Sequence, residues 1–180
     1  MTRKTLIQLH LIAAAFFTPV LLLIACSGGL YLLGYKGNVH STPVSIPQGI
    51  SIDINSTDLD ATVRKLLQRL NQPSDFEYVK QKGATLFTRP TSKTHYEIRT
   101  AEASLQVLIN RPNLQKTLIE LHKGHGPLSF KTFQKFTAIA LLFILLTGTW
   151  LGLSAAGLRR NTSLGLAAGA ILPLLLILAS

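Results

Sequence analysis

Acidic residues are absent from both ends of this sequence. All eight Asp and Glu residues lie between Asp53 and Glu120, and the long apolar segments on either side contain none. Such a distribution indicates two solvents, with water around the centre of the chain and lipid around its flanks. We therefore expect a membrane protein with one sizeable water-exposed domain.

Three segments contain no formal charge: residues 11–34, 136–157 and 163–180. They are about 24, 22 and 18 residues long, against the roughly 20 that an apolar helix needs to cross a bilayer core. The sequence predicts a membrane α-helical protein with three transmembrane helices and an inserted small α+β domain. We divide the chain into an N-terminal end with the first span (1–35), the inserted domain (36–128), the second span (129–158), a loop (159–162) and the third span (163–180).

Basic residues without acidic neighbours indicate the inner side of the membrane. Arg3 and Lys4 precede the first span, and Arg159 and Arg160 lie between the second and third. The positive-inside rule then predicts that the N-terminus and residues 159–162 are cytoplasmic, and that the inserted domain and the C-terminus are outside. The outside domain carries a net charge of about +6, which suits anionic lipid headgroups or an anionic ligand. That location also excludes nucleic acid as a partner, although the whole chain has a net charge of +10.

Cysteine is nearly absent, since Cys26 is the one cysteine of the chain. An internal disulfide is therefore excluded, and the inserted domain must be held together by packing. Leu23-Ile24-Ala25-Cys26 looks like the cleavage box of a bacterial lipoprotein, in which Cys26 would be lipidated. Because apolar residues continue past it to Leu33, we favour the alternative of a thiol buried in the membrane as a small hydrophobe.

The inserted domain shows one amphipathic helix followed by alternating segments. Thr57 is the expected N-cap of this helix, and residues 41–49, rich in Ser, Pro and Gly, are expected to form an extended linker before it. The apolar stripe of the helix consists of Leu59, Val63, Leu66, Leu67 and Leu70. Apolar and polar residues then alternate in about four short segments between residues 76 and 109, which predicts a meander packed on the helix in an α+β layer.

Two histidines lie in the segment that leads back to the membrane. An apolar stripe from Leu114 to Leu121 predicts a helix, which Gly124 weakens. If the helix continues one turn past His122, then His122 and His125 share one face with Glu120 close by, and the group can bind a transition metal or cap a haem. The alternative is a pair of polar residues in a turn at the depth of the lipid headgroups.

Glycines at four-residue spacing occur in two of the spans. Gly148 and Gly152 lie in the inner half of the second span, and Gly165 and Gly169 lie at the start of the third. A loop of about five residues makes the two helices antiparallel neighbours, so that both pairs can face each other and allow close helix packing. One pair facing lipid or a second copy of the protein is the alternative.

The residue patterns of catalysis are also missing. The sequence has no Ser/His/Asp constellation, no paired catalytic carboxylates, no Cys-x-x-Cys and no phosphate-binding glycine loop. His95 lies on the charged face of its predicted strand and is expected to be solvated. We therefore expect a protein that is not an enzyme and has no catalytic residue.

The order of these parts resembles that of the PepSY-associated transmembrane family of the bacterial inner membrane. The matching motifs are Leu9-His10, Leu121-His122-Lys123-Gly124, and Thr147-Gly148 with Trp150. The resemblance implies a multi-pass inner-membrane protein with a PepSY-like domain in the periplasm. Relatives with four spans include haem-containing reductases of siderophore-iron uptake, and the isolated PepSY domain is associated with inhibition of secreted peptidases.

The resemblance also makes His10 and His122 candidate ligands of haem b, and for His10 we favour the alternative of a structural histidine at the membrane interface. They are expected at opposite faces of a bilayer core about 30 Å thick, so they cannot bind one iron, and a redox role would need a partner chain. We interpret the chain as a non-enzymatic binding or accessory subunit that works in the lipid bilayer with another membrane protein or a second copy. A haem-binding redox subunit and a modulator of periplasmic peptidases are the alternatives.

Overall fold

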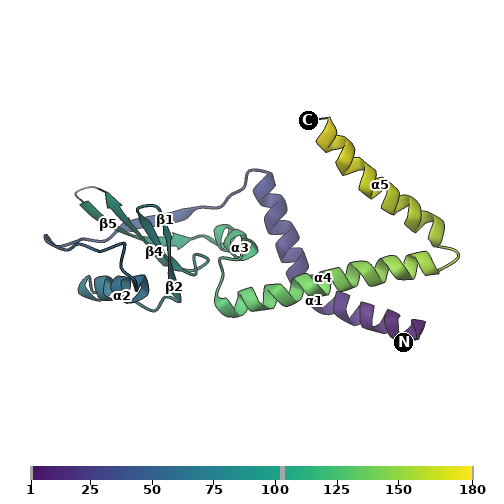
Figure 1. Ribbon diagram of the computed structural model, residues 1–180, viewed down its shortest axis with the longest axis horizontal. Helices are drawn as coiled ribbons and strands as arrows, with labels where there is room; N and C mark the ends of the chain where they lie inside the picture. Colours follow the sequence, from purple (N-terminus) through teal and green to yellow (C-terminus); the bar gives the residue numbers. More distant parts are fainter. Residues whose placement is uncertain (1, 102–103, 180) are drawn as a thin grey trace. The chain divides into compact units, whose positions relative to one another are not determined.

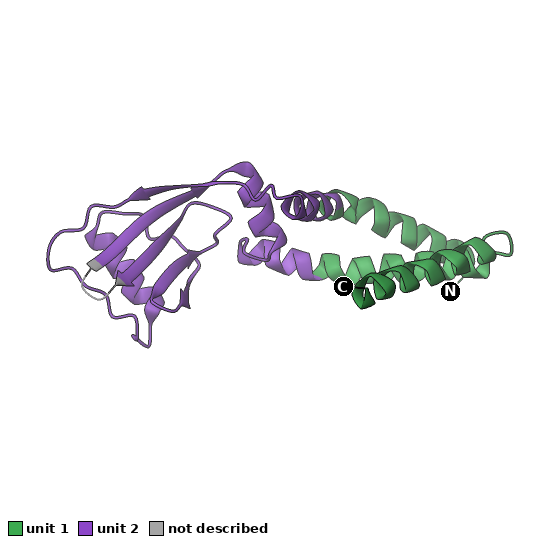
Figure 2. Ribbon diagram, turned by 90° about the horizontal axis from the view of Figure 1, so that it is seen from above, with its two compact units in different colours: residues 1–21, 136–180 green, residues 22–135 purple. Residues whose placement is uncertain are grey.

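The computed structural model describes residues 2–101 and 104–179. The elements, in chain order, are α1 (Arg3–Leu32), β1 (Val39–Pro43), α2 (Leu59–Arg69), β2 (Tyr78–Lys82), β3 (Thr85–Arg89), β4 (His95–Ala101), β5 (Ser104–Pro112), α3 (Leu114–His122), α4 (Leu128–Ser154) and α5 (Arg159–Leu178) (Figure 1). They fall into two compact units, one of residues Leu22–Lys135 and one of Met1–Leu21 with Phe136–Ser180 (Figure 2).

Within the described ranges, the three helices α1, α4 and α5 are long and apolar enough to cross a membrane. All three begin earlier than the uncharged segments of the sequence, so that Arg3, Lys131 and Arg159 lie inside helices. Long basic side chains allow this, because their charged ends reach the headgroup region while the helix continues. Cys26 lies exposed on the surface of α1, so in a membrane its thiol would contact lipid more than protein groups.

The sheet of the described residues has five antiparallel strands in the order β1-β5-β4-β3-β2. The four strands of the predicted meander are confirmed. The predicted linker of residues 41–49 is wrong at its start, because residues 39–43 form the edge strand β1, which pairs with β5 from Val39↔Pro112 to Pro43↔Leu108. An edge strand tolerates Pro43, since one side of it needs no donor for the ladder.

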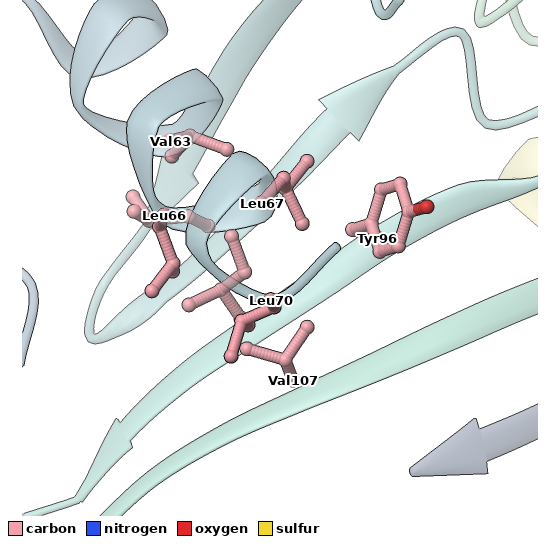
Figure 3. Packing of buried hydrophobic residues seen from close by; sticks show 8 residues of the cluster. Val63, Leu66, Leu67, Leu70, Tyr96 and Val107 are labelled. Atoms are coloured by element: carbon pink, nitrogen blue, oxygen red, sulfur yellow. The ribbon is translucent and has the colours of Figure 1, made fainter. Parts of the chain in front are cut away.

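Helix α2 covers one face of the sheet and forms the core with it, as Figure 3 shows for eight residues of the cluster. The core consists of Val63, Leu66, Leu67, Leu70, Leu86, Tyr96, Ile98 and Val107. The predicted apolar stripe of α2 is thereby confirmed. The N-cap is Asp58 and not Thr57: the Asp58 carboxylate accepts a hydrogen bond from the Ala61 main-chain nitrogen at 2.9 Å, as a short acidic side chain at this position does well.

The other face of the sheet carries polar side chains. Successive residues of a strand point to opposite faces, so Leu86 and Ile98 in the core place Phe87 and Glu97 on the face away from α2. Helix α3 follows β5 directly, and its N-cap Asn113 accepts a hydrogen bond from the Lys116 main-chain nitrogen at 2.9 Å. The sheet therefore has one apolar face and one polar face.

Candidate functional site

A cavity of about 500 Å³ opens in the unit of residues 22–135. Its lining includes Phe87 and Arg89 of β3, Glu97 of β4 and Asn110 of β5, which alternate with core residues and so belong to the polar face of the sheet. Helix α3 and the turn after it complete the lining with Lys116, Glu120 and His125. The titratable groups of the lining come from β2, β3 and β4, from α3 and from the turn after it.

A chain of hydrogen bonds runs along one wall of the cavity. The Arg89 Nη1 atom donates to the Thr91 hydroxyl at 2.8 Å, and this hydroxyl donates to Glu120 Oε2 at 2.8 Å. The imidazole of His125 joins the same carboxylate oxygen through Nδ1 at 2.7 Å. Because carboxylate Oε2 is the shared acceptor, it holds β3, α3 and the following turn in one arrangement.

Glu120 is a buried carboxylate with several donors. Burial raises its pKa, but hydrogen bonds from His125, Thr91 and Lys116 outweigh burial and lower the pKa to about 2. The Nζ atom of Lys116 lies 3.2 Å from Glu120 Oε1, and that of Lys123 lies 3.7 Å from it. Glu120 is therefore ionised at neutral pH and already has its full set of partners.

The two histidines of the cavity are neutral bases. Burial is the main reason why the pKa of His125 lies below its usual value, and the charge of Arg89 adds to it. Burial likewise lowers the pKa of His95, whose Nδ1 donates to the Lys93 carbonyl at 2.9 Å. The prediction that His95 is solvated is wrong: its side chain is 7% exposed and lines the cavity together with Glu120 and His125.

A second polar cluster lies further along the same face. Asn110 accepts from the Ser41 hydroxyl at 2.7 Å and donates to Glu97 Oε2 at 2.9 Å, while Arg99 donates to Glu97 Oε1 at 2.7 Å. Both carboxylate oxygens of Glu97 therefore accept hydrogen bonds from neighbouring side chains. The strand register places these groups together. Asn110 lies opposite Ser41 on β1 and opposite His95 on β4, and Glu97 follows His95 by two residues on the same face.

Arg89 differs from these groups because its charge has no ion-pair partner. It is 8% exposed, and within residues 2–101 and 104–179 no carboxylate lies within ion-pair distance of it. Its buried Nε atom has no hydrogen-bond acceptor in the same residues. A buried guanidinium without a carboxylate is unfavourable unless something else compensates its charge.

His122 and His125 do not form the shared ligand face that a longer helix would have given. Helix α3 ends at His122, because Gly124 adopts a left-handed conformation with φ of +72°. His122 Nδ1 then lies 2.8 Å from the Ile24 carbonyl oxygen, whereas His125 turns to Glu120. No group of three or more His, Cys, Asp or Glu residues in the described chain has the geometry of a metal site.

His10 lies in the other unit, packed against α4. Its Nδ1 is 2.8 Å from the Thr147 hydroxyl, which itself donates to the Phe143 carbonyl at 2.6 Å. The hydroxyl has one proton, so His10 Nδ1 is the donor of this hydrogen bond. Gly148 makes room for the ring, because a Cβ there would lie 3.2 Å from His10 Cε1.

The glycines of the spans do not face one another as two pairs. Gly148 contacts His10, and Gly152 contacts Thr162, whose Oγ1 would lie 2.5 Å from a Cβ at Gly152. Gly165 and Gly169 have open space beside them, with no other described atom within 4 Å of such a Cβ apart from their own helix backbone. Gly152 therefore meets Thr162 in the first turn of α5, and not a glycine.

Sequence reasoning missed Arg89, Thr91 and the cavity itself. Strand alternation does place Arg89 and Glu97 on the face away from the core, and this signal was available. The sequence does not show that α3 and the turn after it pack against the loop between β3 and β4, because such a long-range contact depends on how the chain folds in three dimensions.

Compared with known proteins, the chain matches no family model, and no curated protein or solved structure is significantly similar to it.

Proposed function

We propose that the chain is a non-enzymatic binding or accessory subunit of the bacterial inner membrane, with a PepSY-like domain on the periplasmic side. The observation that carries this proposal is the cavity of about 500 Å³ on the polar face of the sheet, in a chain with three helices fit to span a membrane. A cavity of this size is typical of small-molecule sites. Its carboxylates are held by neighbouring donors and not presented as an acid and base pair, which favours binding over catalysis.

The connection between the sheet and α4 supports a domain that stands at the membrane surface. The Leu128 main-chain nitrogen, at the start of α4, donates to both oxygens of the Glu77 carboxylate at 3.1 Å. One turn later, Lys131 Nζ donates to the Tyr78 hydroxyl at 2.5 Å. A carboxylate at a helix N-terminus is favourable for its dipole as well, so the beginning of β2 is firmly tied to the beginning of this span.

The distribution of charge supports the orientation. Arg3 and Lys4 lie at the start of α1, and Arg159 and Arg160 lie at the start of α5. Acidic residues are missing from both places, which is the pattern of cytoplasmic membrane ends. The sheet domain then belongs to the opposite side.

Thiol labelling in intact cells tests the proposal. In a Cys26→Ala background, Lys82→Cys places a thiol on the exposed edge of β2, and Arg160→Cys places one at the α4–α5 turn. We expect a membrane-impermeant maleimide to label position 82 in intact cells and position 160 only after permeabilisation. The reverse pattern would put the domain in the cytoplasm and refute a periplasmic binding subunit.

A haem-binding redox subunit is the second candidate. The observation in its favour is that His10 and His122 each use Nδ1 to donate to a fixed oxygen, of Thr147 and Ile24 respectively, so that in the neutral form of the ring Nε2 has the lone pair a metal ligand needs. This is the tautomer and the second hydrogen bond that ligand histidines have in proteins. A Soret band of the purified protein that disappears in His122→Ala or His10→Ala would favour this candidate. If protein purified from cells supplied with haem shows no Soret band, the candidate is refuted.

A further inference from the structure

The cavity has an excess of positive charge once internal pairs are considered. The carboxylates in its lining are Glu97 and Glu120, and both are occupied: Glu97 by Arg99 and Asn110, and Glu120 by Lys116 and its other donors. The cations Lys80, Lys82 and Arg89 also line the cavity, and within residues 2–101 and 104–179 none of them has an ion-pair partner. An occupant of this space therefore meets uncompensated positive charge.

Arg89 is the cation that most needs a partner. It is over nine-tenths buried, its Nη1 has only a neutral hydroxyl as acceptor, and its Nε has none among the described residues. Lys80 and Lys82, by contrast, are exposed to water at the edge of the sheet. Since a guanidinium matches the two oxygens of a carboxylate or phosphate with its fork of donors, an oxyanion is the group that would best compensate Arg89.

The cavity also has room and apolar surface for more than an inorganic ion. Its volume of about 500 Å³ lies within the range of sites for small organic ligands. Its lining includes the apolar side chains of Phe87 on β3 and Val39 on β1. These two side chains offer an apolar wall for the carbon skeleton of a ligand whose charged end is at Arg89.

We infer that this cavity binds a small soluble organic anion, whose carboxylate or phosphate group is held by Arg89 deep in the cavity and by Lys80 and Lys82 at its rim. The inference names the ligand class of the proposed binding subunit and rests on that function. The ligand class and the proposed function are nevertheless tested separately. Binding is measured on the purified protein, and the result of that measurement does not depend on which side of the membrane the domain occupies.

Calorimetric titration of the full-length protein in dodecyl maltoside tests the inference. The probes are succinate for the carboxylate and glycerol 3-phosphate for the phosphate, with sodium chloride at equal ionic strength as the blank. We expect saturable binding of one molecule per chain for at least one of them. No saturable heat from either probe at millimolar concentration would overturn the inference.

Substitutions locate the binding in the cavity. Arg89→Met removes the charge at similar length, and loss of charged hydrogen bonds should weaken binding about 10- to 100-fold. Because a change at a buried residue can prevent folding, the exposed pair Lys80→Ala with Lys82→Ala provides a second test. We expect this double variant to bind the anion at least about threefold more weakly than the parent. Lys65→Ala, on the exposed side of α2, is the control with the same loss of charge and should bind like the parent.

Two further outcomes would also overturn the inference. If Arg89→Met folds and binds as tightly as the parent, or if Lys65→Ala weakens binding as much as the rim pair, the heat reports general charge attraction and not this cavity. If dihexanoyl phosphatidylglycerol below its micelle concentration binds but neither soluble probe does, the ligand is a lipid headgroup and not a soluble anion.

Discussion

His122 Nδ1 lies 2.8 Å from the carbonyl oxygen of Ile24, so the last residue of α3 is hydrogen-bonded to the backbone of α1. The imidazole reaches this oxygen because Gly28 has no side chain: a Cβ there would lie 2.9 Å from His122 Cε1. The Ser27 hydroxyl is 3.2 Å from the same nitrogen and adds a second polar contact. Gly28 therefore has a specific role, which is to admit the histidine ring against the helix.

Gly28→Ala should break this contact. The added methyl group displaces the His122 ring, and the net loss of one hydrogen bond costs about 0.5 to 1.5 kcal/mol. Gly29→Ala is the matched control, since it lies one residue further along the same helix, where an added methyl group would meet no described atom within 4 Å other than those of its own helix. Thermal unfolding in detergent should give a lower Tm for Gly28→Ala than for Gly29→Ala. Equal Tm values would show that the contact does not contribute to stability.

The core of the sheet domain predicts a large effect at Leu66. This side chain is 4% exposed in the middle of the α2 stripe, so Leu66→Ala should lower the free energy of unfolding by about 2 to 5 kcal/mol. Gln68→Ala, on the exposed face of the same helix, should change it by less than about 0.5 kcal/mol. Denaturant unfolding followed by circular dichroism measures both. A small effect at Leu66 would mean that α2 does not pack as described.

The parts of the fold that follow from local patterns could be predicted from the sequence. Leu66 and its neighbours repeat with helical spacing, and the spans are long, mainly apolar segments without charge, so the residue pattern by itself indicates these helices. Strand β1 could not be found in this way. Its five residues end in proline, and only pairing with Pro112 and the preceding residues of β5 defines it as a strand.

The candidate site was less predictable than the fold. The spacing of His122 and His125 suggests a shared face, yet their positions depend on Gly124, whose positive φ ends the helix between them and sends the two rings to different partners. Arg89 is separated by about thirty residues from Glu120, and Thr91 joins them only because α3 packs against the loop between β3 and β4. Spacing in the sequence contains little information about such a network.

Acid should destabilise the sheet domain through Glu120. Hydrogen bonds lower its pKa to about 2 from the ordinary 4.5, so its contribution to stability is complete above pH 4.5 and is lost as the pH falls toward 2. Burial lowers the pKa of His125 and His95, and their protonation below pH 6.5 adds a loss in the same direction.

Glu120→Gln isolates this contribution. The variant should have a lower Tm than the parent at pH 6, and the difference should shrink between pH 4.5 and 2 as the parent carboxylate becomes protonated. Tm measured in detergent across this range is the test. Parallel curves for parent and variant would show that the Glu120 carboxylate is not the group responsible.

The close approach of Gly152 to Thr162 makes the α4–α5 turn sensitive to a single methyl group. A Cβ at Gly152 would lie 2.5 Å from Thr162 Oγ1 and 3.3 Å from its Cβ, and the Thr162 hydroxyl is already fixed by donating to the Leu158 carbonyl at 2.9 Å. Gly152→Ala should therefore force the turn apart and lower Tm in detergent, because overpacking at a contact of this kind costs about 1 to 3 kcal/mol. Gly165→Ala adds the same methyl group beside open space in α5 and should change Tm little.

In a Cys26→Ala background, Gly152→Cys with Thr162→Cys tests the contact directly, since the two Cβ atoms are close enough for a disulfide. Crosslinking within one chain supports the contact, whereas crosslinking only between chains, or equal effects of the two alanine variants, would contradict it.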